Sequence, residues 1–184
     1  MTDSELTQPQ GPYSIIICDP PWDYAGQLQH GGAGQGDSGG ALKHYPTMRV
    51  KDMIATINPL SWAADDCLLF MWTTWPHLDQ AIALGHGWGF RYVHTPFVWV
   101  KDRVNPGYYT MTSTEPVLCF KHGRIPQPRG SRNQRQVVEA ARGRHSAKPR
   151  EVQARIDLMW PTQRKLEMFA RSAYPGWDAW GNEV

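Results

Sequence analysis

The sequence of 184 residues contains few cysteines, no zinc-binding pattern and no long apolar run. Its three cysteines stand far apart without Cys-x-x-Cys spacing, and its seven histidines form no His-Glu-x-x-His motif. We therefore expect no disulfide framework and no metal, and we expect each cysteine to be a small buried apolar residue. The longest apolar run, Cys67 to Trp72, has the length of a strand rather than that of a membrane span.

Signals for export and for phosphate binding are also missing. Residues 1–10 are polar and lack the charged-then-apolar pattern of a secretion signal, so we expect a cytoplasmic protein with no membrane partner. The glycine-rich stretch 31–40 lacks the Lys-Ser/Thr of a phosphate-binding loop. The length predicts a single domain over residues 1–184, with disorder at 1–10 and a mobile loop at 23–43.

Positive charge is concentrated in one segment. The net charge of +2 conceals nine Lys and Arg residues and a single acid, Glu139, between residues 121 and 150. Such a block indicates either a contact surface for a polyanion such as nucleic acid or a solvated loop, and its composition alone favours neither. We expect a basic loop region at 121–147. The side chains that we expect to hold a nucleic-acid backbone are Arg129, Arg132 and Arg135.

Apolar periodicity predicts that strands and helices alternate along the chain. The runs with a strand pattern are 13–18, 67–72, 91–101, 116–121, 165–171 and 177–180. Helical spacing follows a capping residue at Thr47, runs from Pro76 to the glycines Gly85 and Gly87, and resumes at Pro149. This alternation is typical of an α/β fold, a mostly parallel sheet with helices on both faces, which binds ligands beyond the carboxyl ends of its strands. The tryptophans that we place in its core are Trp62, Trp72, Trp88, Trp99 and Trp160.

The first predicted strand ends in Asp19-Pro20-Pro21-Trp22, which suits attack by the amino group of adenine on a methyl donor. That nitrogen is a poor nucleophile because its lone pair is delocalised into the ring. An Asp19 carboxylate that accepts one N–H and a Pro20 carbonyl that accepts the other would favour the tetrahedral geometry that attack requires. The prolines fix the backbone without adding N–H donors, and Trp22 offers a flat face for the base. The alternative is a proline-terminated strand with an incidental Asp and Trp.

Further motifs, in a fixed order, resemble the adenine-N6 methyltransferases typified by the catalytic subunit of the eukaryotic messenger-RNA adenosine methyltransferase, a family with bacterial and phage members. The resemblance runs from Tyr13 to Asn182, nearly the whole chain. Besides residues 19–22, the matching segments are 44–48 (HYPTM), 69–73 (LFMWT), 97–101 (FVWVK), 107–110 (GYYT) with Glu115, 145–149 (HSAKP), 165–171 (KLEMFAR) and 176–182.

The resemblance implies a Rossmann-like methyltransferase fold with a permuted motif order, and S-adenosylmethionine as the cofactor. It implies a catalytic set of Asp19, Pro20, Pro21 and Trp22. The residues that it places on the cofactor are Asp19, Lys148 at the carboxylate, Arg171, Asn182 at the ribose hydroxyls, and Glu183. Those that it places on the substrate side, with Trp22, are Tyr108, Tyr109 and Glu115.

Several of these residues also have an alternative explanation without a function. Lys148 could be solvated, and Arg171 could pair with Glu167 or Asp178. The residue after Asn182 is next to last in the chain, so fraying there could weaken ribose binding. The loop at 23–43 could be a lid over the base or a plain linker.

Other functions also stay open. Methyltransferases of cytosine or of protein amides carry Ser or Asn before the two prolines and Tyr after them, unlike Asp19 and Trp22 here. An inactive nucleic-acid-binding partner subunit of the resembled family would lack the acid. The residues do not decide between DNA and RNA; we favour DNA because the chain is compact and resembles bacterial or phage members. A homodimer or a partner subunit could supply recognition contacts.

Overall fold

The computed structural model of the protein describes residues 8–23, 47–107, 109–143, 147–181 and 184. In this part of the chain, seven strands form one sheet in the order β5-β3-β4-β2-β1-β6-β7. The strands are β1 (Tyr13–Cys18), β2 (Ala63–Trp72), β3 (Arg91–Pro106), β4 (Met111–His122), β5 (Val137–Glu139), β6 (Lys165–Met168) and β7 (Asp178–Trp180). All neighbouring strands are parallel except where β4 pairs with β2 and β3.

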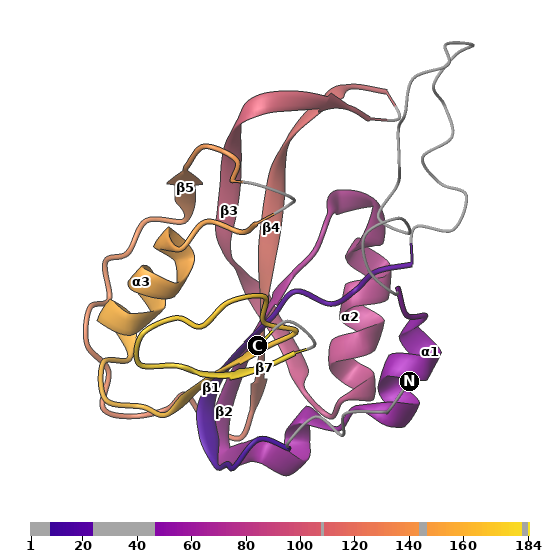
Figure 1. Cartoon of the computed structure of the whole chain (residues 1–184). Helices are drawn as coiled ribbons and strands as arrows, with labels where there is room; N and C mark the ends of the chain where they lie inside the picture. Colours follow the sequence, from indigo (N-terminus) through magenta and orange to yellow (C-terminus); the bar gives the residue numbers. More distant parts are fainter. Residues whose placement is uncertain (1–7, 24–46, 108, 144–146, 182–183) are drawn as a thin grey trace.

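The helices cover both faces of the sheet, as the alternation predicted (Figure 1). They are α1 (Val50–Thr56), α2 (Leu78–Gly87) and α3 (Glu151–Met159), with short 3₁₀ turns η2 (Pro59–Trp62) and η3 (Trp75–His77). One apolar cluster joins the sheet to α1 and α2, and a second joins its other face to α3. The mostly parallel, Rossmann-like architecture expected from the sequence is thereby confirmed.

The central strand β1 is apolar on both of its faces. Ile16 packs in the cluster with α1 and α2, whereas Ile15 and Ile17 pack in the cluster with α3. All three side chains are at most 2% exposed, and burial of each is worth about 1.5 to 3 kcal/mol. This burial fixes the position of the residues that follow β1.

The carboxyl ends of β1, β2 and β6 lie level with one another, at Cys18, Trp72 and Met168. We call this side of the sheet the carboxyl edge. The hairpin of β3 and β4 extends beyond it (Figure 1).

One detail of the helices differs from the sequence prediction, and another agrees with it. The N-cap residue of α1 is Arg49 rather than Thr47, and within the described part of the chain no side chain caps this helix. The helix α2 ends at Gly87, in agreement with the predicted end near Gly85 and Gly87. Position 85 is packed so closely that a Cβ there would lie 2.3 Å from the Phe120 ring. Close packing of the helix on β4 therefore explains Gly85.

The expected basic loop at 121–147 contains a strand, and this part of the prediction is wrong. Residues Val137–Glu139 form β5, which pairs with β3, and the Val138 side chain is fully buried. Arg155 of α3 also donates hydrogen bonds to the carbonyls of Arg135 and Val137. A three-residue strand is too short to show an apolar periodicity in the sequence. Its stability comes from its pairing with β3.

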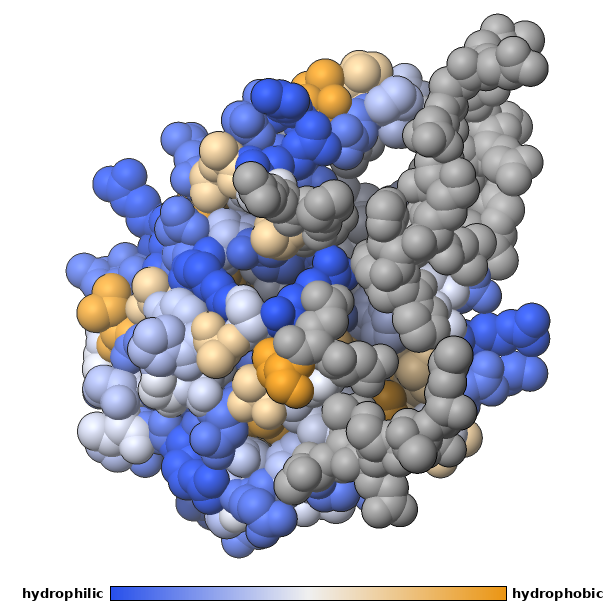
Figure 2. Space-filling model, viewed as in Figure 1, coloured by the Kyte–Doolittle hydropathy of each residue, from blue (hydrophilic) through white to orange (hydrophobic). Residues whose placement is uncertain are grey.

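The predicted core is confirmed. The five tryptophans expected there are at most 9% exposed, and all three cysteines are buried and free. Burial raises the pKa of the Cys119 thiol to about 12, so this thiol stays neutral. The face in Figure 2 is mostly hydrophilic, with apolar residues in small separate spots.

Two features are absent from the described residues. None of the described helices has the length and apolar character to span a bilayer. The same residues contain no group of three or more His, Cys, Asp or Glu arranged for a metal ion.

Candidate functional site

A row of alternating charges lies at the carboxyl edge. The Lys148 ammonium is 2.9 Å from Asp19 Oδ2 and 3.5 Å from Glu115 Oε2. The other oxygen of Glu115, Oε1, is 2.5 Å from the ammonium of Lys101. We call these four residues, Asp19, Lys148, Glu115 and Lys101, the charge row. The structure thus brings together two residues implied for the cofactor and one implied for the substrate side.

The charge row runs from the interior to the surface. The exposed fraction of the side chain rises from 8% for Lys101 through 14% for Glu115 and 20% for Lys148 to 24% for Asp19. Asp19 is therefore the most exposed member of the charge row.

Different elements hold the members of the charge row. Asp19 directly follows β1, and Lys148 stands just before α3. The ammonium groups of Lys148 and Lys101 lie 5.7 Å and 5.2 Å from the rings of Trp72 and Trp99, within reach of cation–π attraction. Lys148 is consequently not a solvated side chain.

Glu115 is ionised in this setting. Burial raises the pKa of its carboxyl, but the charges of Lys148 and Lys101, together with their hydrogen bonds, outweigh burial and lower the pKa below its ordinary value of 4.5. An ionised Glu115 in turn keeps both ammonium groups in place.

The prolines after Asp19 form a tight turn. The Pro20 carbonyl accepts a hydrogen bond of 2.8 Å from the Trp22 N–H, and the Pro21 carbonyl accepts one of 2.8 Å from the Met48 N–H. A carbonyl oxygen has two lone pairs, so Pro20 retains capacity for one more donor. Its predicted bond to the adenine amino group stays a prediction.

The expectation that Trp22 presents an open face to a base is not met. The side chain is 3% exposed, and its indole N–H donates to the Trp72 carbonyl at 3.3 Å. Its ring lies 6.1 Å from the ring of His77. Trp22 therefore belongs to the core, where its hydrogen bond to Trp72 fixes the turn after Asp19 against the end of β2.

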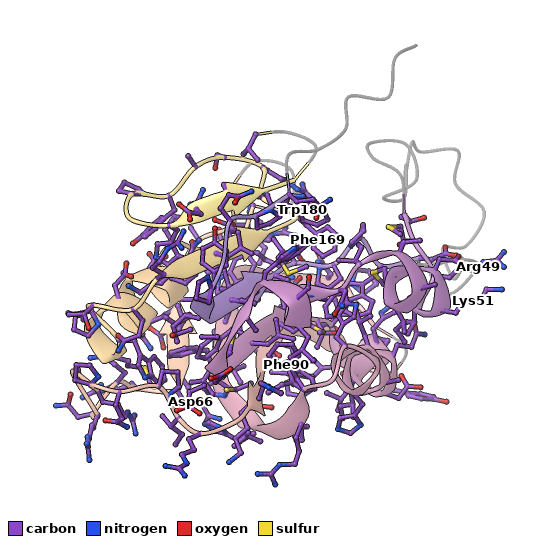
Figure 3. The ribbon with its side chains drawn as sticks, turned by 90° about the horizontal axis from the view of Figure 1, so that it is seen from below. Arg49, Lys51, Asp66, Phe90, Phe169 and Trp180 are labelled. Carbon is purple, nitrogen blue, oxygen red and sulfur yellow. The ribbon has the colours of Figure 1, made fainter. Side chains whose placement is uncertain are left out.

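The backbone after β6 has an unusual conformation. Phe169 has a φ of 57°, in the left-handed region that residues other than glycine rarely adopt. Its ring packs 5.7 Å from that of Trp180 (Figure 3). The neighbouring Gly181 approaches the Ala170 backbone so closely that a Cβ there would lie 2.5 Å from the Ala170 oxygen. Strained backbone of this kind clusters at functional sites, and here it lies two residues before Arg171.

The two acids suggested as alternative partners of Arg171 form ion pairs with other arginines. Glu167 accepts a hydrogen bond from Arg150 at 3.0 Å, and Asp178 accepts one from Arg164 at 3.0 Å. Asn182 and Glu183, which the resemblance places on the cofactor, lie outside the described residues.

The substrate-side residues separate in space. Tyr109 is fully exposed in the turn of the β3–β4 hairpin, whereas Glu115 lies farther along β4 in the charge row. Tyr108 lies outside the described residues, as do residues 24–46, which include most of the expected loop at 23–43. The first seven residues and positions 144–146 are outside them too.

The expected role of Arg129 in holding a nucleic-acid backbone is not supported. Its guanidinium packs 5.3 Å from the Trp160 ring, and the adjacent Gly130 N–H donates to the Met159 carbonyl at the end of α3. Because α3 begins at the carboxyl edge and leads into the start of β6, Arg129 lies at the opposite edge from Asp19. Arg132 and Arg135 are exposed along the segment that leads back toward β5.

The residues at the carboxyl edge fit a zwitterionic amino-acid group such as that of S-adenosylmethionine. A carboxylate and an ammonium, those of Asp19 and Lys148, lie side by side there and complement an amino and a carboxylate group. The chemistry of this pair therefore fits the cofactor that the motifs imply.

Lys101 was missed as a site residue. The alternation of β3 could have identified it, because residues 99 and 101 of a strand point to the same face. Trp99 is buried on that face, and a charge beside it needs a partner. The sequence did not reveal that partner.

Replacing Lys101 with Met should raise the pKa of Glu115. The pKa in the folded protein lies below the ordinary value, so ionised Glu115 stabilises the fold above pH 4.5, and this contribution disappears as the pH falls through the folded pKa. In the variant this loss should begin at higher pH. At neutral pH the loss of unfolding free energy should stay below the roughly 3 to 5 kcal/mol of a fully broken buried pair, because Lys148 remains.

Urea unfolding across the acidic pH range measures both effects. Arg103→Met is a matched control, because it removes the same charge from a side chain that is 77% exposed. Identical pH profiles for Lys101→Met and this control would show that Lys101 does not act on Glu115.

Comparison with known proteins gives consistent matches. The MT-A70 family model matches residues 13–183. The chain is 44% identical to the Type II methyltransferase M.MunI of Mycoplasma sp, over 96% of this chain and 79% of that protein. It is 30% identical to the N(6)-adenosine-methyltransferase MT-A70-like protein of Arabidopsis thaliana, over 95% of this chain and 24% of that protein. With the N(6)-adenosine-methyltransferase catalytic subunit METTL3 of Homo sapiens the identity is 26%, over 95% of this chain and 28% of that one.

Proposed function

The chain belongs to the MT-A70 family and is an adenine-N6 methyltransferase, and from this premise we propose that it transfers the methyl group of S-adenosylmethionine to adenine in DNA. The observation that carries the proposal is the position of Asp19. It is a partly exposed carboxylate at the carboxyl edge, held by Lys148 at 2.9 Å. This edge is where α/β folds bind their ligands.

In the proposed reaction Asp19 accepts a hydrogen bond from the amino group of the target adenine. That bond strengthens as the nitrogen becomes tetrahedral, so it stabilises the transition state more than the bound substrate. The Pro20 carbonyl accepts the second N–H. Lys148 and the turn at Trp22 hold both acceptors in place before the substrate arrives, and this positioning provides much of the acceleration.

S-adenosylmethionine supplies an electrophilic methyl group for direct displacement. We propose that Asp19 and Lys148 hold its amino-acid group, with Arg171 beside the strained end of β6. By resemblance, Asn182 would contact the ribose hydroxyls, and Glu183 would also contact the cofactor. Asp19 can serve both ligands because a carboxylate offers two oxygens with about four acceptor sites.

We favour DNA over RNA on the strength of the relatives. The chain covers four fifths of a bacterial Type II methyltransferase at 44% identity, but only about a quarter of the two N(6)-adenosine methyltransferases, at 26 to 30%. Of the expected backbone contacts, we retain Arg132 and Arg135, which are exposed in the basic segment. A homodimer or a partner subunit that adds recognition contacts remains a prediction.

DNA and RNA oligomers of the same mixed sequence, in single- and double-stranded form, test this choice. With labelled S-adenosylmethionine, we expect DNA to take up the label and RNA to take up much less. Preferential labelling of RNA would overturn the choice of DNA and leave the adenine chemistry intact.

A further inference from the structure

One tryptophan differs from all the others. The nine tryptophans all lie in the described part of the chain; seven are at most 9% exposed and Trp180 is half-buried. Trp75 is 44% exposed. Tryptophan is enriched among the residues that dominate binding interfaces, so an exposed Trp is a candidate contact residue.

The exposed ring is held in place. Its indole N–H donates a hydrogen bond of 2.8 Å to the Thr114 hydroxyl on β4. Its main chain belongs to η3, where the His77 N–H donates to the Thr74 carbonyl at 2.9 Å. Little conformational freedom is therefore left for a ligand to remove.

Trp75 lies beside the charge row but on the other face of the sheet. It follows the end of β2 by three residues, at the carboxyl edge. Its anchor Thr114 is the neighbour of Glu115 in β4, and successive residues of a strand point to opposite faces. Trp75 therefore lies on the side of α2, whereas Glu115 and Lys101 lie on the side of α3.

Methylation of adenine in a duplex would be helped by an aromatic side chain close to the target base. A base inside a duplex must leave its stack to reach Asp19, and its neighbour then loses a stacking partner. An aromatic side chain that covers the neighbour offsets part of that cost. Trp22 cannot do so because it is buried.

We infer that Trp75 stacks on a base adjacent to the target adenine and so supports its extrusion toward Asp19. This inference rests on the proposed function. It assigns to Trp75 the role that the sequence suggested for Trp22, but toward the neighbouring base and not toward the target. Trp75 is thus a substrate-binding residue outside the charge row.

Kinetics of four variants on the DNA substrate test the inference. Stacking on an aromatic side chain is worth roughly a 5- to 150-fold change in affinity, so Trp75→Ala should raise the KM for DNA by about that factor. Trp75→Phe should restore most of the affinity, whereas Trp75→Leu, equally apolar but not planar, should not. Thr114→Val, which keeps the ring but removes its anchor, should give an intermediate loss.

The affinity for S-adenosylmethionine and the Tm should stay unchanged in all four variants. Leu158→Ala is the control, because Leu158 is 57% exposed at the far end of α3. An unchanged KM for DNA in Trp75→Ala, or equal recovery by Leu and Phe, would overturn the inference alone. A parallel loss of cofactor affinity and Tm would make Trp75 a structural residue and also overturn it. If the wild-type protein methylates no oligomer, the proposed function fails first.

Discussion

Replacing Asp19 with Ala should lower the rate of methyl transfer by about a hundred- to a thousandfold, the usual effect of removing one preorganised hydrogen-bond partner of a transition state. Binding of S-adenosylmethionine should weaken far less. Lys148 still has Glu115 as an ion-pair partner at 3.5 Å, and this partner holds the ammonium group in place for the cofactor. Asp19→Asn should be nearly as inactive, since it retains the size of the side chain but not its charge. Single-turnover rates and calorimetry measure the two quantities separately.

Asp52→Ala is the matched control for this prediction. Asp52 is an exposed acid in the first turn of α1, and its side chain takes no part in the charge row. If Asp19→Ala kept a tenth of wild-type turnover, Asp19 would not hold the amino group in the transition state.

Replacing Lys148 with Ala should raise the dissociation constant of S-adenosylmethionine at least tenfold, because a charged hydrogen bond contributes roughly 1.5 to 3 kcal/mol. The structure adds a second effect. The charge of Lys148 is the main influence that lowers the pKa of Glu115, so its loss raises that pKa, and Glu115 then takes up a proton at higher pH than in the wild type. Because the resemblance places Glu115 on the substrate side, turnover of the variant should begin to decline at a higher pH than turnover of the wild type.

Lys51→Ala, on the exposed side of α1, controls for the loss of one positive charge. Calorimetry at several pH values gives the cofactor affinity, and a pH–rate profile gives the second effect. An unchanged dissociation constant in Lys148→Ala would contradict the role that the family resemblance implies for Lys148.

The layers of the fold could be predicted because they depend on local apolar patterns. The runs in β1 and β2 are buried on both faces, and three isoleucines in succession leave few alternatives to a central strand. By contrast, β5 has three residues and owes its existence to β3, so no local pattern marked it.

The charge row could be predicted only in part. Asp19 and Lys148 stood in recognisable motifs, but the contact of Lys101 with Glu115 depends on the register of β3 and β4, in which Trp99 pairs with Glu115. Register is a property of the assembled sheet, so residues fourteen positions apart in the chain gave no sign of their contact.

Exposure was the least predictable property. Trp22 and Trp75 are both tryptophans beside prolines, yet the first is 3% exposed and the second 44%. Likewise the charge of Arg129 did not show that its guanidinium lies over Trp160 at the far edge of the sheet. Composition indicates which residue types are present, whereas the packing of the sheet decides which of them a substrate can reach.

The position of the transferred methyl group tests the central claim most directly. Wild-type protein is incubated with DNA oligomers and S-adenosylmethionine that carries a deuterated methyl group, and the digested nucleosides are analysed by mass spectrometry. We expect the label on N6 of adenine with wild-type protein, and a signal reduced at least a hundredfold with Asp19→Ala. Label on N4 of cytosine, or on N6 of adenine at equal levels in both proteins, would contradict the assignment of Asp19 as the group that activates adenine.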